Sequence, residues 1–182
     1  MGLHIPGYGD FRRCMKKMSW SDWAILVVLT VAPTVAGIVL ACVFEERNTS
    51  KPLHKPTWAP TEWLFGLISV GLYLFIGFAS YLLWKASHFV SAETTAIWIM
   101  YALQLGLSWS WLPLVYRCGF LAGGLIAITA CWALVIACVL TSFAYSKLVS
   151  FMFMPYLVWI SYIVAVNYNI VLLNGAVDSR TF

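Results

Sequence analysis

The sequence has few charged residues. Only 10% of its 182 residues are Asp, Glu, Lys or Arg, whereas 62% are hydrophobic. Soluble domains carry about 25% charged residues, and a chain of this length cannot cover so much apolar surface in a water-soluble fold. The composition therefore excludes an ordinary soluble domain and indicates an integral membrane protein.

Motifs for metal binding and redox chemistry are also lacking. The three histidines lie outside the apolar segments, and no C-x-x-C occurs. An odd number of cysteines, mostly within apolar segments, is typical of small buried thiols rather than of disulfides or metal ligands. We therefore expect no metal site and no cofactor. The five cysteines are Cys14, Cys42, Cys118, Cys131 and Cys138.

Five apolar segments are long enough to cross the hydrocarbon core, which takes about 20 residues of helix. They cover residues 23–44, 63–84, 95–116, 118–145 and 149–173. Backbone polar groups in lipid must be satisfied within each helix. The sequence therefore predicts an all-α integral membrane protein, a bundle of five transmembrane helices. The predicted organisation is a basic N-terminal extension (1–22), a membrane domain (23–174) and a short C-terminal tail (175–182).

No Asp, Glu, Lys, Arg or His lies in the middle of a predicted span. Ion-coupled carriers and voltage sensors depend on such groups, so both classes are disfavoured. Neither a Ser/His/Asp set nor paired carboxylates nor a phosphate loop occurs, and we expect no catalytic residues. The remaining polar groups are amides, hydroxyls and indoles, which suit a large apolar or amphipathic ligand.

The basic residues give only a weak indication of orientation. A cluster of Arg12, Arg13, Lys16 and Lys17 precedes the first span and is typical of contact with anionic lipid headgroups. Five spans would place six basic residues on the N-terminal side and five on the other, out of 11 in total. The positive-inside rule therefore barely decides the topology, and the short cluster does not favour nucleic acid as a partner.

Three spans carry polar and aromatic residues at helical spacing on one face. In the third these are Tyr101, Gln104, Ser108 and Trp111, and in the fifth Tyr156, Trp159, Ile163, Asn167 and Ile170. In the second they are Trp63, Gly66, Val70, Tyr73, Gly77, Tyr81 and Trp84. Such faces fit both helix packing and a ligand cavity, and the periodicity leaves both open. Gly119, Gly123 and Ala127 have small-xxx-small spacing, which fits either a homodimer seam or an internal contact.

Four stretches of the chain resemble, in order, the signatures of the TspO/MBR family. They are "APTVAG" from residue 32, "LHKPTWAPTEW" with "LYLFIGFASYLLWK", "YALQLGLSWSWLPL" from residue 101, and "MPYLVWISYIVAVNY" from residue 154. The resemblance implies five transmembrane helices, often in a dimer, with a cavity that opens toward the first loop. It implies cholesterol, porphyrins and benzodiazepine-like compounds as ligands, and in animals an outer mitochondrial membrane protein linked to sterol or tetrapyrrole transport.

The family's cavity positions can be carried over residue by residue. The resemblance implies a binding site formed by Ala41, Phe44, Phe65, Gly66, Ile68, Trp109, Trp111, Trp159, Ile163 and Val166. The family's sterol-associated stretch matches Val166, Asn167 and Tyr168. The implied partners are a sterol, a porphyrin or haem-type molecule, membrane lipid and a second copy of the chain.

The first loop contains two prolines and two tryptophans within residues 55–63. Proline restricts the backbone, and tryptophan prefers the membrane interface. We expect Pro56, Trp58, Pro60 and Trp63 to form a lid over the cavity, although a simple interfacial anchor would use the same residues.

Some positions depart from the family pattern. Ser69, in "GLIS", replaces a tryptophan of the ligand pocket, and Ser108 stands where the family has Asn. No basic residue follows Tyr168 within reach, so the proposed sterol pattern is broken. We therefore expect a non-enzymatic receptor or transport protein with altered ligand preference. A porphyrin-degrading enzyme and a membrane scaffold without a small-molecule ligand are the alternatives.

Overall fold

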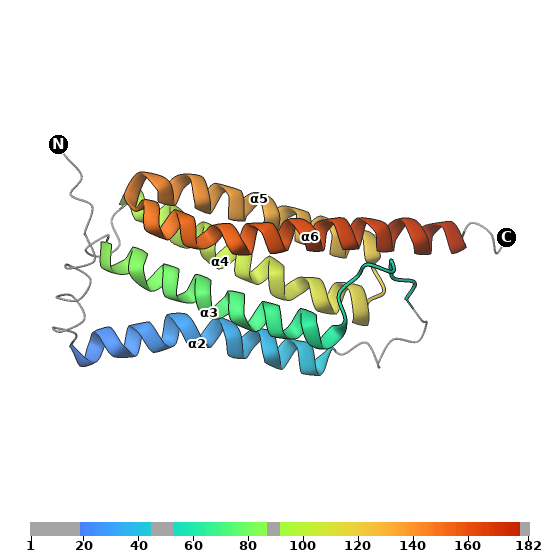
Figure 1. The fold of residues 1–182 in the computed structure, drawn as a ribbon, viewed down its shortest axis with the longest axis horizontal. Coiled ribbons are helices and arrows are strands. Elements are labelled where there is room, and N and C mark those ends of the chain that lie inside the picture. The colour runs from blue at the N-terminus through green and yellow to red at the C-terminus, as the bar shows by residue number, and fades with distance from the viewer. Residues whose placement is uncertain (1–18, 45–52, 87–91, 179–182) are drawn as a thin grey trace.

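The computed structural model describes residues 19–44, 53–86 and 92–178. Within them the chain forms five α-helices and one short π-helix that lie along a common long axis (Figure 1). In order these are α2 (Trp20–Val43), α3 (Glu62–Ala86), α4 (Ala92–Leu112), η2 (Pro113–Arg117), α5 (Leu121–Tyr145) and α6 (Lys147–Asp178). The predicted all-α five-helix architecture is confirmed. The basic cluster at residues 12–17 and Cys14 lie outside the described residues.

Four of these helices are long and apolar enough to cross a membrane, and α4 is not among them. The other four helices qualify over Trp20–Val43, Glu62–Lys85, Leu121–Phe143 and Lys147–Gly175. The third predicted span is thus less apolar than expected, because α4 carries Gln104 and Ser108. Both side chains are buried within the bundle. These two polar residues of α4 therefore face protein.

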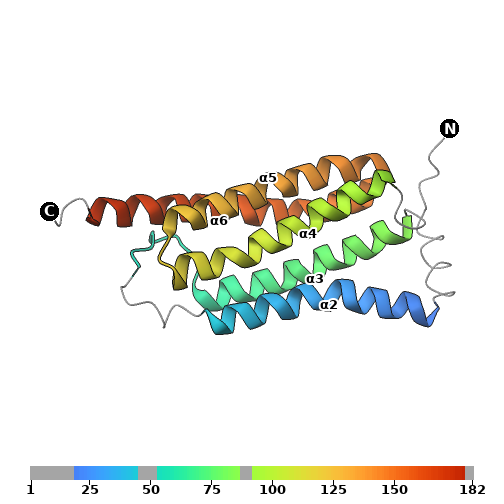
Figure 2. The ribbon, with the colours of Figure 1, turned by 180° about the vertical axis from the view of Figure 1, so that it is seen from behind.

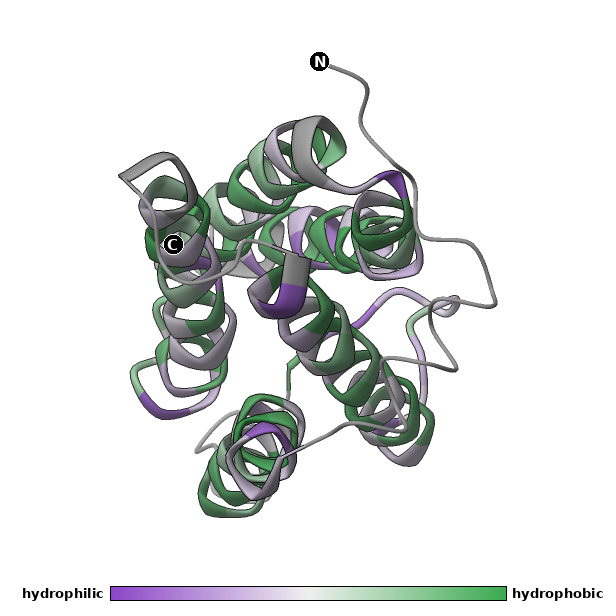
Figure 3. Cartoon of the chain, turned by 90° about the vertical axis from the view of Figure 1, so that its left-hand side faces the viewer, coloured by the Kyte–Doolittle hydropathy of each residue, from purple (hydrophilic) through white to green (hydrophobic). Residues whose placement is uncertain are grey.

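The helices pack as two groups. Helix α5 packs against α4 and α6, whereas α2 packs mainly against α3. Helix α3 also packs against α6, and α2 touches α4. The rear view shows α4 beside α5, with α2 at the outer edge of the bundle (Figure 2). Seen along the long axis, hydrophobic residues run along every helix (Figure 3), as expected for elements that face lipid as well as each other.

The end of the bundle where α2 begins has a closely packed core. Large side chains from four helices fill it, and none is more than 6% exposed. They include Ile76 and Leu83 of α3, Ile97 and Tyr101 of α4, Val139 of α5 and Val149 and Phe153 of α6. The opposite end contains smaller residues in α2 and α3 and is open, as described below.

A proline and a glycine allow α2 and α3 to approach closely. Pro33 in α2 has no N–H, so the carbonyl of Leu29 one turn earlier loses its helical partner. That carbonyl faces Gly77 of α3, where an added Cβ would lie 2.5 Å from Leu29 O and 2.7 Å from Thr30 Cα. Any side chain at position 77 would therefore push the two helices apart.

An ion pair also links α2 and α3 near the beginning of α2, where Asp22 Oδ2 lies 3.7 Å from Lys85 Nζ.

The connection from α4 to α5 differs from the prediction. The third span was expected over 95–116 and the fourth over 118–145, but α4 ends at Leu112 and α5 begins at Leu121. Pro113 interrupts the α-helical hydrogen bonds, and the N–H of Cys118 bonds to Pro113 O at 3.0 Å in a π-helical turn. Gly119 then adopts a φ of 63°, which ends the turn and sets the start of α5.

The cysteines are only partly as expected. All four described cysteines are free thiols, and Cys131 and Cys138 are buried. Cys42 and Cys118 are exposed, so the prediction of buried thiols was wrong for them. Cys42 lies in the last turn of α2, the outermost helix, and Cys118 follows η2 in the connecting turn, where neither is covered by a neighbouring helix.

Candidate ligand-binding site

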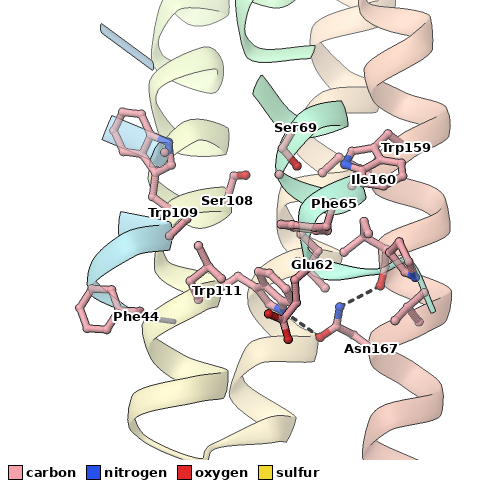
Figure 4. Close-up of a pocket in the computed structure, with 18 of the residues that line it drawn as sticks. Phe44, Glu62, Phe65, Ser69, Ser108, Trp109, Trp111, Trp159, Ile160 and Asn167 are labelled. Carbon is pink, nitrogen blue, oxygen red and sulfur yellow. Dashed lines mark hydrogen bonds between the residues drawn. The ribbon is translucent and has the colours of Figure 1, made fainter. Parts of the chain in front are cut away.

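A cavity of about 620 Å³ lies between α2, α3, α4 and α6, at the end of the bundle nearest the loop of residues 53–61 (Figure 4). It exists because α2 and α3 present small residues to it, namely Gly37, Ala41, Gly66 and Ser69. A Cβ added to Gly66 would meet no atom within 4 Å. We call this cavity the inner pocket. Its volume lies within the range of about 300–1,000 Å³ that is usual for small-molecule sites.

An array of aromatic rings borders the inner pocket toward the loop. Consecutive ring centroids are 5.5–6.0 Å apart, which is typical of favourable aromatic pairs. The array runs through Trp58, Tyr162, Trp159, Phe65, Trp111 and Tyr116. Four of its rings line the inner pocket and offer a ligand flat, polarisable surfaces from three helices and η2, namely Phe65, Trp111, Tyr116 and Trp159. Trp58 and Tyr162 continue the array outside the pocket.

Trp111 and Asn167 form a buried hydrogen-bonded pair in the pocket wall. The indole Nε1 of Trp111 donates to Asn167 Oδ1 at 2.7 Å, and Asn167 Nδ2 donates to Ile163 O at 2.8 Å (Figure 4). The two residues are 6% and 3% exposed. The pair fixes the orientation of the Trp111 ring and joins α4 to α6, so Trp111 is both a pocket surface and a structural brace.

Hydroxyl groups line the deep end of the pocket. Tyr73 OH and Ser108 Oγ share a hydrogen bond of 2.8 Å, and Tyr156 OH donates to Ser108 Oγ at 3.5 Å. Ser69 lies one turn along α3 from Tyr73 and also faces the pocket. These groups can orient a ligand by hydrogen bonds without placing a charge in the membrane interior.

The loop of residues 53–61, which covers the mouth of the inner pocket, is attached to α6 at two points. Tyr162 OH donates to Trp58 O at 2.7 Å. Asn174 accepts from His54 N at 3.1 Å and donates to His54 O at 3.0 Å. At the mouth of the pocket, Lys55 Nζ lies 3.8 Å from Glu62 Oε1. The mouth is thus the charged end of an otherwise apolar pocket.

The structure brings most of the expected binding residues together. Ala41, Phe44, Phe65, Gly66, Trp109, Trp111, Trp159, Ile163 and Val166 all line the inner pocket. Ile68 does not, because its side chain points to a second hollow on the outside of the bundle. Of the expected lid residues, Pro60 and Trp63 line the inner pocket and Trp58 lines the outer hollow, whereas Pro56 lines neither.

The remaining expected residues fall in different places. Asn167 lines the pocket next to Val166, but Tyr168 is 54% exposed on the outer surface of α6. Gly123 and Ala127 are buried within their own bundle, as an internal contact requires, and Gly119 is exposed in the turn before α5. A homodimer seam at these positions stays a prediction.

Sequence reasoning missed several pocket residues. Tyr73, Ser108 and Tyr156 were placed on inward helical faces, but nothing in the spacing distinguished the pocket floor from ordinary packing. Lys55 and Glu62 were recognised only as part of the loop. Across residues 19–44, 53–86 and 92–178, no three His, Cys, Asp or Glu side chains gather as they would around a metal ion.

Comparison with known proteins agrees with this arrangement. The TspO/MBR family model matches residues 24–173. The chain is 29% identical to a translocator protein of Sus scrofa over 153 residues, covering 80% of this chain and 88% of that protein. It is 26% identical to protein CrtK of Rhodobacter capsulatus over 152 residues, covering 82% and 92%. It is 33% identical to a tryptophan-rich protein TspO of Archaeoglobus fulgidus over 123 residues, covering 68% and 78%.

Proposed function

The chain belongs to the TspO/MBR family of membrane proteins, and on this premise we propose that it is a receptor or transport protein for flat, largely apolar ligands. The proposed ligand classes are sterols and porphyrins, with benzodiazepine-like compounds as synthetic ligands. They would bind in the inner pocket, between α2, α3, α4 and α6.

The observation that carries this proposal is the chemistry of the inner pocket. Its walls are mostly apolar and aromatic, with hydroxyl groups at the deep end, Lys55 and Glu62 at the mouth, and the amide of Asn167 paired with Trp111 in the wall. Burial of apolar ligand surface would contribute about 25 cal/mol per Å², and stacking on Phe65 and Trp159 would add to it. The hydroxyls of Tyr73 and Ser108 would orient the deep end of the ligand.

The mouth of the pocket provides a further element of selectivity. Lys55 and Glu62 can contact a charged or polar substituent that remains near the membrane surface. A porphyrin presents carboxylates to such a site, and a sterol presents a hydroxyl. Both ligand classes therefore have an apolar plate for the aromatic walls and a polar end for the mouth.

The test is a binding titration with a variant that fills the pocket. Protoporphyrin, and separately the fluorescent sterol dehydroergosterol, are added to the purified full-length protein in detergent, and the ligand emission is recorded. In Gly66→Phe the new ring occupies the open space of the pocket. The matched control is Gly71→Phe, also on α3. A Cβ added to Gly71 would meet no atom within 4 Å, and Gly71 lines neither the inner pocket nor the second hollow.

We expect saturable binding by the unaltered protein and by Gly71→Phe, and loss of it in Gly66→Phe. Equal binding by all three proteins would show that the ligand does not occupy the inner pocket. If the unaltered protein bound neither probe saturably, the scaffold alternative would be favoured and the proposed function would be wrong.

We propose that the protein is not an enzyme. The polar groups in the depth of the pocket are hydroxyls in contact with each other, and Ser69 occupies the position at which the family pattern has a tryptophan. An indole is easily oxidised, whereas a serine hydroxyl is not. Illuminated incubation with protoporphyrin should yield no product beyond the protein-free control, and a new chromophore would favour the porphyrin-degrading alternative.

The multi-pass helices make this an integral membrane protein. If its host is an animal, we propose the outer mitochondrial membrane as its location. Fractionation of host mitochondria into outer and inner membranes, with immunodetection of the chain, tests this. Recovery in another membrane would show that the location does not follow the family relation.

A further inference from the structure

A second hollow lies on the outside of the bundle, between α3, α6 and the loop. We call it the outer groove. Its volume is about 670 Å³. Leu64, Ile68 and Leu72 of α3 form one side, Pro155, Val158, Trp159 and Tyr162 of α6 form the other, and Trp58, Ala59, Pro60 and Thr61 close the end nearest the loop. This surface is almost entirely apolar.

The outer groove faces the lipid bilayer. Both helices that form it are among those long and apolar enough to span a membrane, and Val158 on its rim is 70% exposed. From Leu64 to Leu72 the groove covers eight residue steps, or roughly 12 Å at 1.5 Å per residue. This length is about two fifths of the thickness of the hydrocarbon core. An apolar molecule dissolved in the bilayer can enter it without crossing water.

The outer groove and the inner pocket have a common wall. Ala59, Pro60 and Trp159 line both. Ala59 and Pro60 are small backbone-anchored groups of the loop, so the indole of Trp159 is the only long side chain in the wall. Its ring packs between that of Phe65 on the pocket side, with centroids 5.8 Å apart and planes at 41°, and that of Tyr162 on the groove side, with centroids 5.5 Å apart and planes at 33°.

Within the described residues the indole of Trp159 is not held by a hydrogen bond, a feature that it shares with Trp109 in the inner pocket. Trp111 and Trp132 each donate an indole hydrogen bond, to Asn167 at 2.7 Å and to Ser161 at 2.8 Å. The indole of Trp159 donates none within the described parts of the chain, where its contacts are ring contacts. A rotation of this ring breaks no hydrogen bond.

The backbone of α6 lacks one helical hydrogen bond in the turn before Trp159. Pro155, which also lines the outer groove, lies one turn before Trp159 inside α6. Its missing N–H leaves the carbonyl of Phe151 without a helical partner, and helices bend at such positions. A small bend of α6 here would widen the gap between α3 and α6 at the level of the shared wall.

Access through the mouth would disturb more interactions. The loop is held to α6 by the two hydrogen bonds between His54 and Asn174 and by the one from Tyr162 to Trp58. Lifting the loop breaks all three, and it also exposes an apolar ligand to water. The route past Trp159 avoids both.

From these observations we propose that ligands reach the inner pocket from the bilayer through the outer groove, with the indole of Trp159 as a gate between the two. The inference rests on the proposed function, since it assumes a ligand in the inner pocket. It assigns the outer groove as a vestibule for flat or elongated apolar molecules dissolved in the membrane.

The experiment measures association and dissociation rates of protoporphyrin on the full-length protein in phosphatidylcholine vesicles. Porphyrin emission is followed after rapid mixing, and release is followed after addition of excess empty vesicles. Ile68→Trp fills the outer groove. The matched control is Leu67→Trp, the adjacent residue, which is 63% exposed on α3 and lines neither cavity. A second groove variant, Val158→Trp, changes a rim residue outside the core.

If the groove is the access route, both groove variants slow association and dissociation by about tenfold while the equilibrium dissociation constant stays constant. The added indole has to leave the groove before a ligand can pass, which raises the barrier in both directions equally. Leu67→Trp should bind and release at the rates of the unaltered protein. A further variant, Asn174→Leu, loosens the loop and should leave both rates unchanged.

The proposal would be overturned if Ile68→Trp and Val158→Trp exchanged ligand at the rates of Leu67→Trp. A large acceleration of exchange in Asn174→Leu would also overturn it, because that result would indicate access through the mouth. In both cases saturable binding would persist, so the proposed function would stand. Absence of saturable binding by the unaltered protein would instead remove the proposed function, and the access route with it.

Discussion

Replacing Asn167 by Leu tests whether the pair formed with Trp111 holds α4 and α6 together. The substitution keeps the approximate volume of the side chain but removes the acceptor of the Trp111 indole. It also removes the donor to Ile163 O, a bond within α6. Since Trp111 is 6% exposed, its N–H would be left buried without a partner.

The expected effect follows from two bounds. A buried donor deprived of its partner costs about 1–3 kcal/mol, whereas interhelical hydrogen bonds in membrane proteins average about 0.6 kcal/mol and reach about 1.7 kcal/mol. We expect Asn167→Leu to lower the free energy of unfolding by about 1–2 kcal/mol, because both partners are almost fully buried. This corresponds to a factor of about 5–30 in the folded-to-unfolded ratio.

Asn169 provides a matched control on the same helix. Its Nδ2 donates only to Ala165 O, within α6, at 2.9 Å. Asn169→Leu therefore loses a local bond and no bond between helices. Unfolding is followed by far-ultraviolet circular dichroism while dodecylsulfate is titrated into the protein in mild detergent. Asn167→Leu should unfold at clearly lower dodecylsulfate than Asn169→Leu.

A double-mutant cycle isolates the pair itself. In Trp111→Phe the donor is absent, so Asn167→Leu should cost less in that background than in the unaltered protein. A coupling energy of about 0.5–1.7 kcal/mol is expected. Coupling indistinguishable from zero, or equal destabilisation by Asn167→Leu and Asn169→Leu, would show that the pair does not brace the pocket wall.

Two further substitutions test how the bundle packs. Gln104 is fully buried and its Nε2 has no partner in the described structure, so Gln104→Met should raise the free energy of unfolding by about 1 kcal/mol. A decrease in the same dodecylsulfate titration would show that the amide has a partner, such as a bound water. Gly77→Ala should destabilise the protein by more than about 1 kcal/mol, since its Cβ would meet the backbone of α2. Gly71→Ala, in open space, should be neutral or slightly stabilising, and equal effects of the two alanines would contradict the close α2–α3 contact.

Length and apolarity predicted the helices because each span needs a similar number of residues to cross lipid, although α4 is less apolar than the other four. The boundaries were harder. The chain accommodates Pro113 by continuing in a π-helical turn, so residues 113–116 of η2 fall inside the third predicted span. Gln104 and Ser108 lower the apolarity of α4, but their helical spacing is also typical of one face of an ordinary span.

Periodicity correctly placed residues on inward faces but could not divide a face into packed and open parts. On α3, Gly66 and Tyr73 line the inner pocket, whereas Gly77, on the same stripe, is pressed against α2. The difference depends on the residues of other helices at the same depth. The family resemblance misplaced Ile68 for a similar reason. Its neighbour Ser69 lines the inner pocket, whereas Ile68, one position earlier on the helix, lines the outer groove.

The two cavities follow from one feature of the bundle, the position of α3. Helix α3 packs against both α2 and α6, and at Gly77 its lack of a side chain allows it to approach the α2 backbone closely. The resulting space near the loop is divided by Trp159, which α6 inserts between the inner pocket and the outer groove. A side chain in this position lines the inner pocket and also forms part of the wall between it and the outer groove. Substitutions of Trp159 should therefore alter affinity and exchange rates together, whereas Gly66→Phe acts on affinity and Ile68→Trp on rates alone.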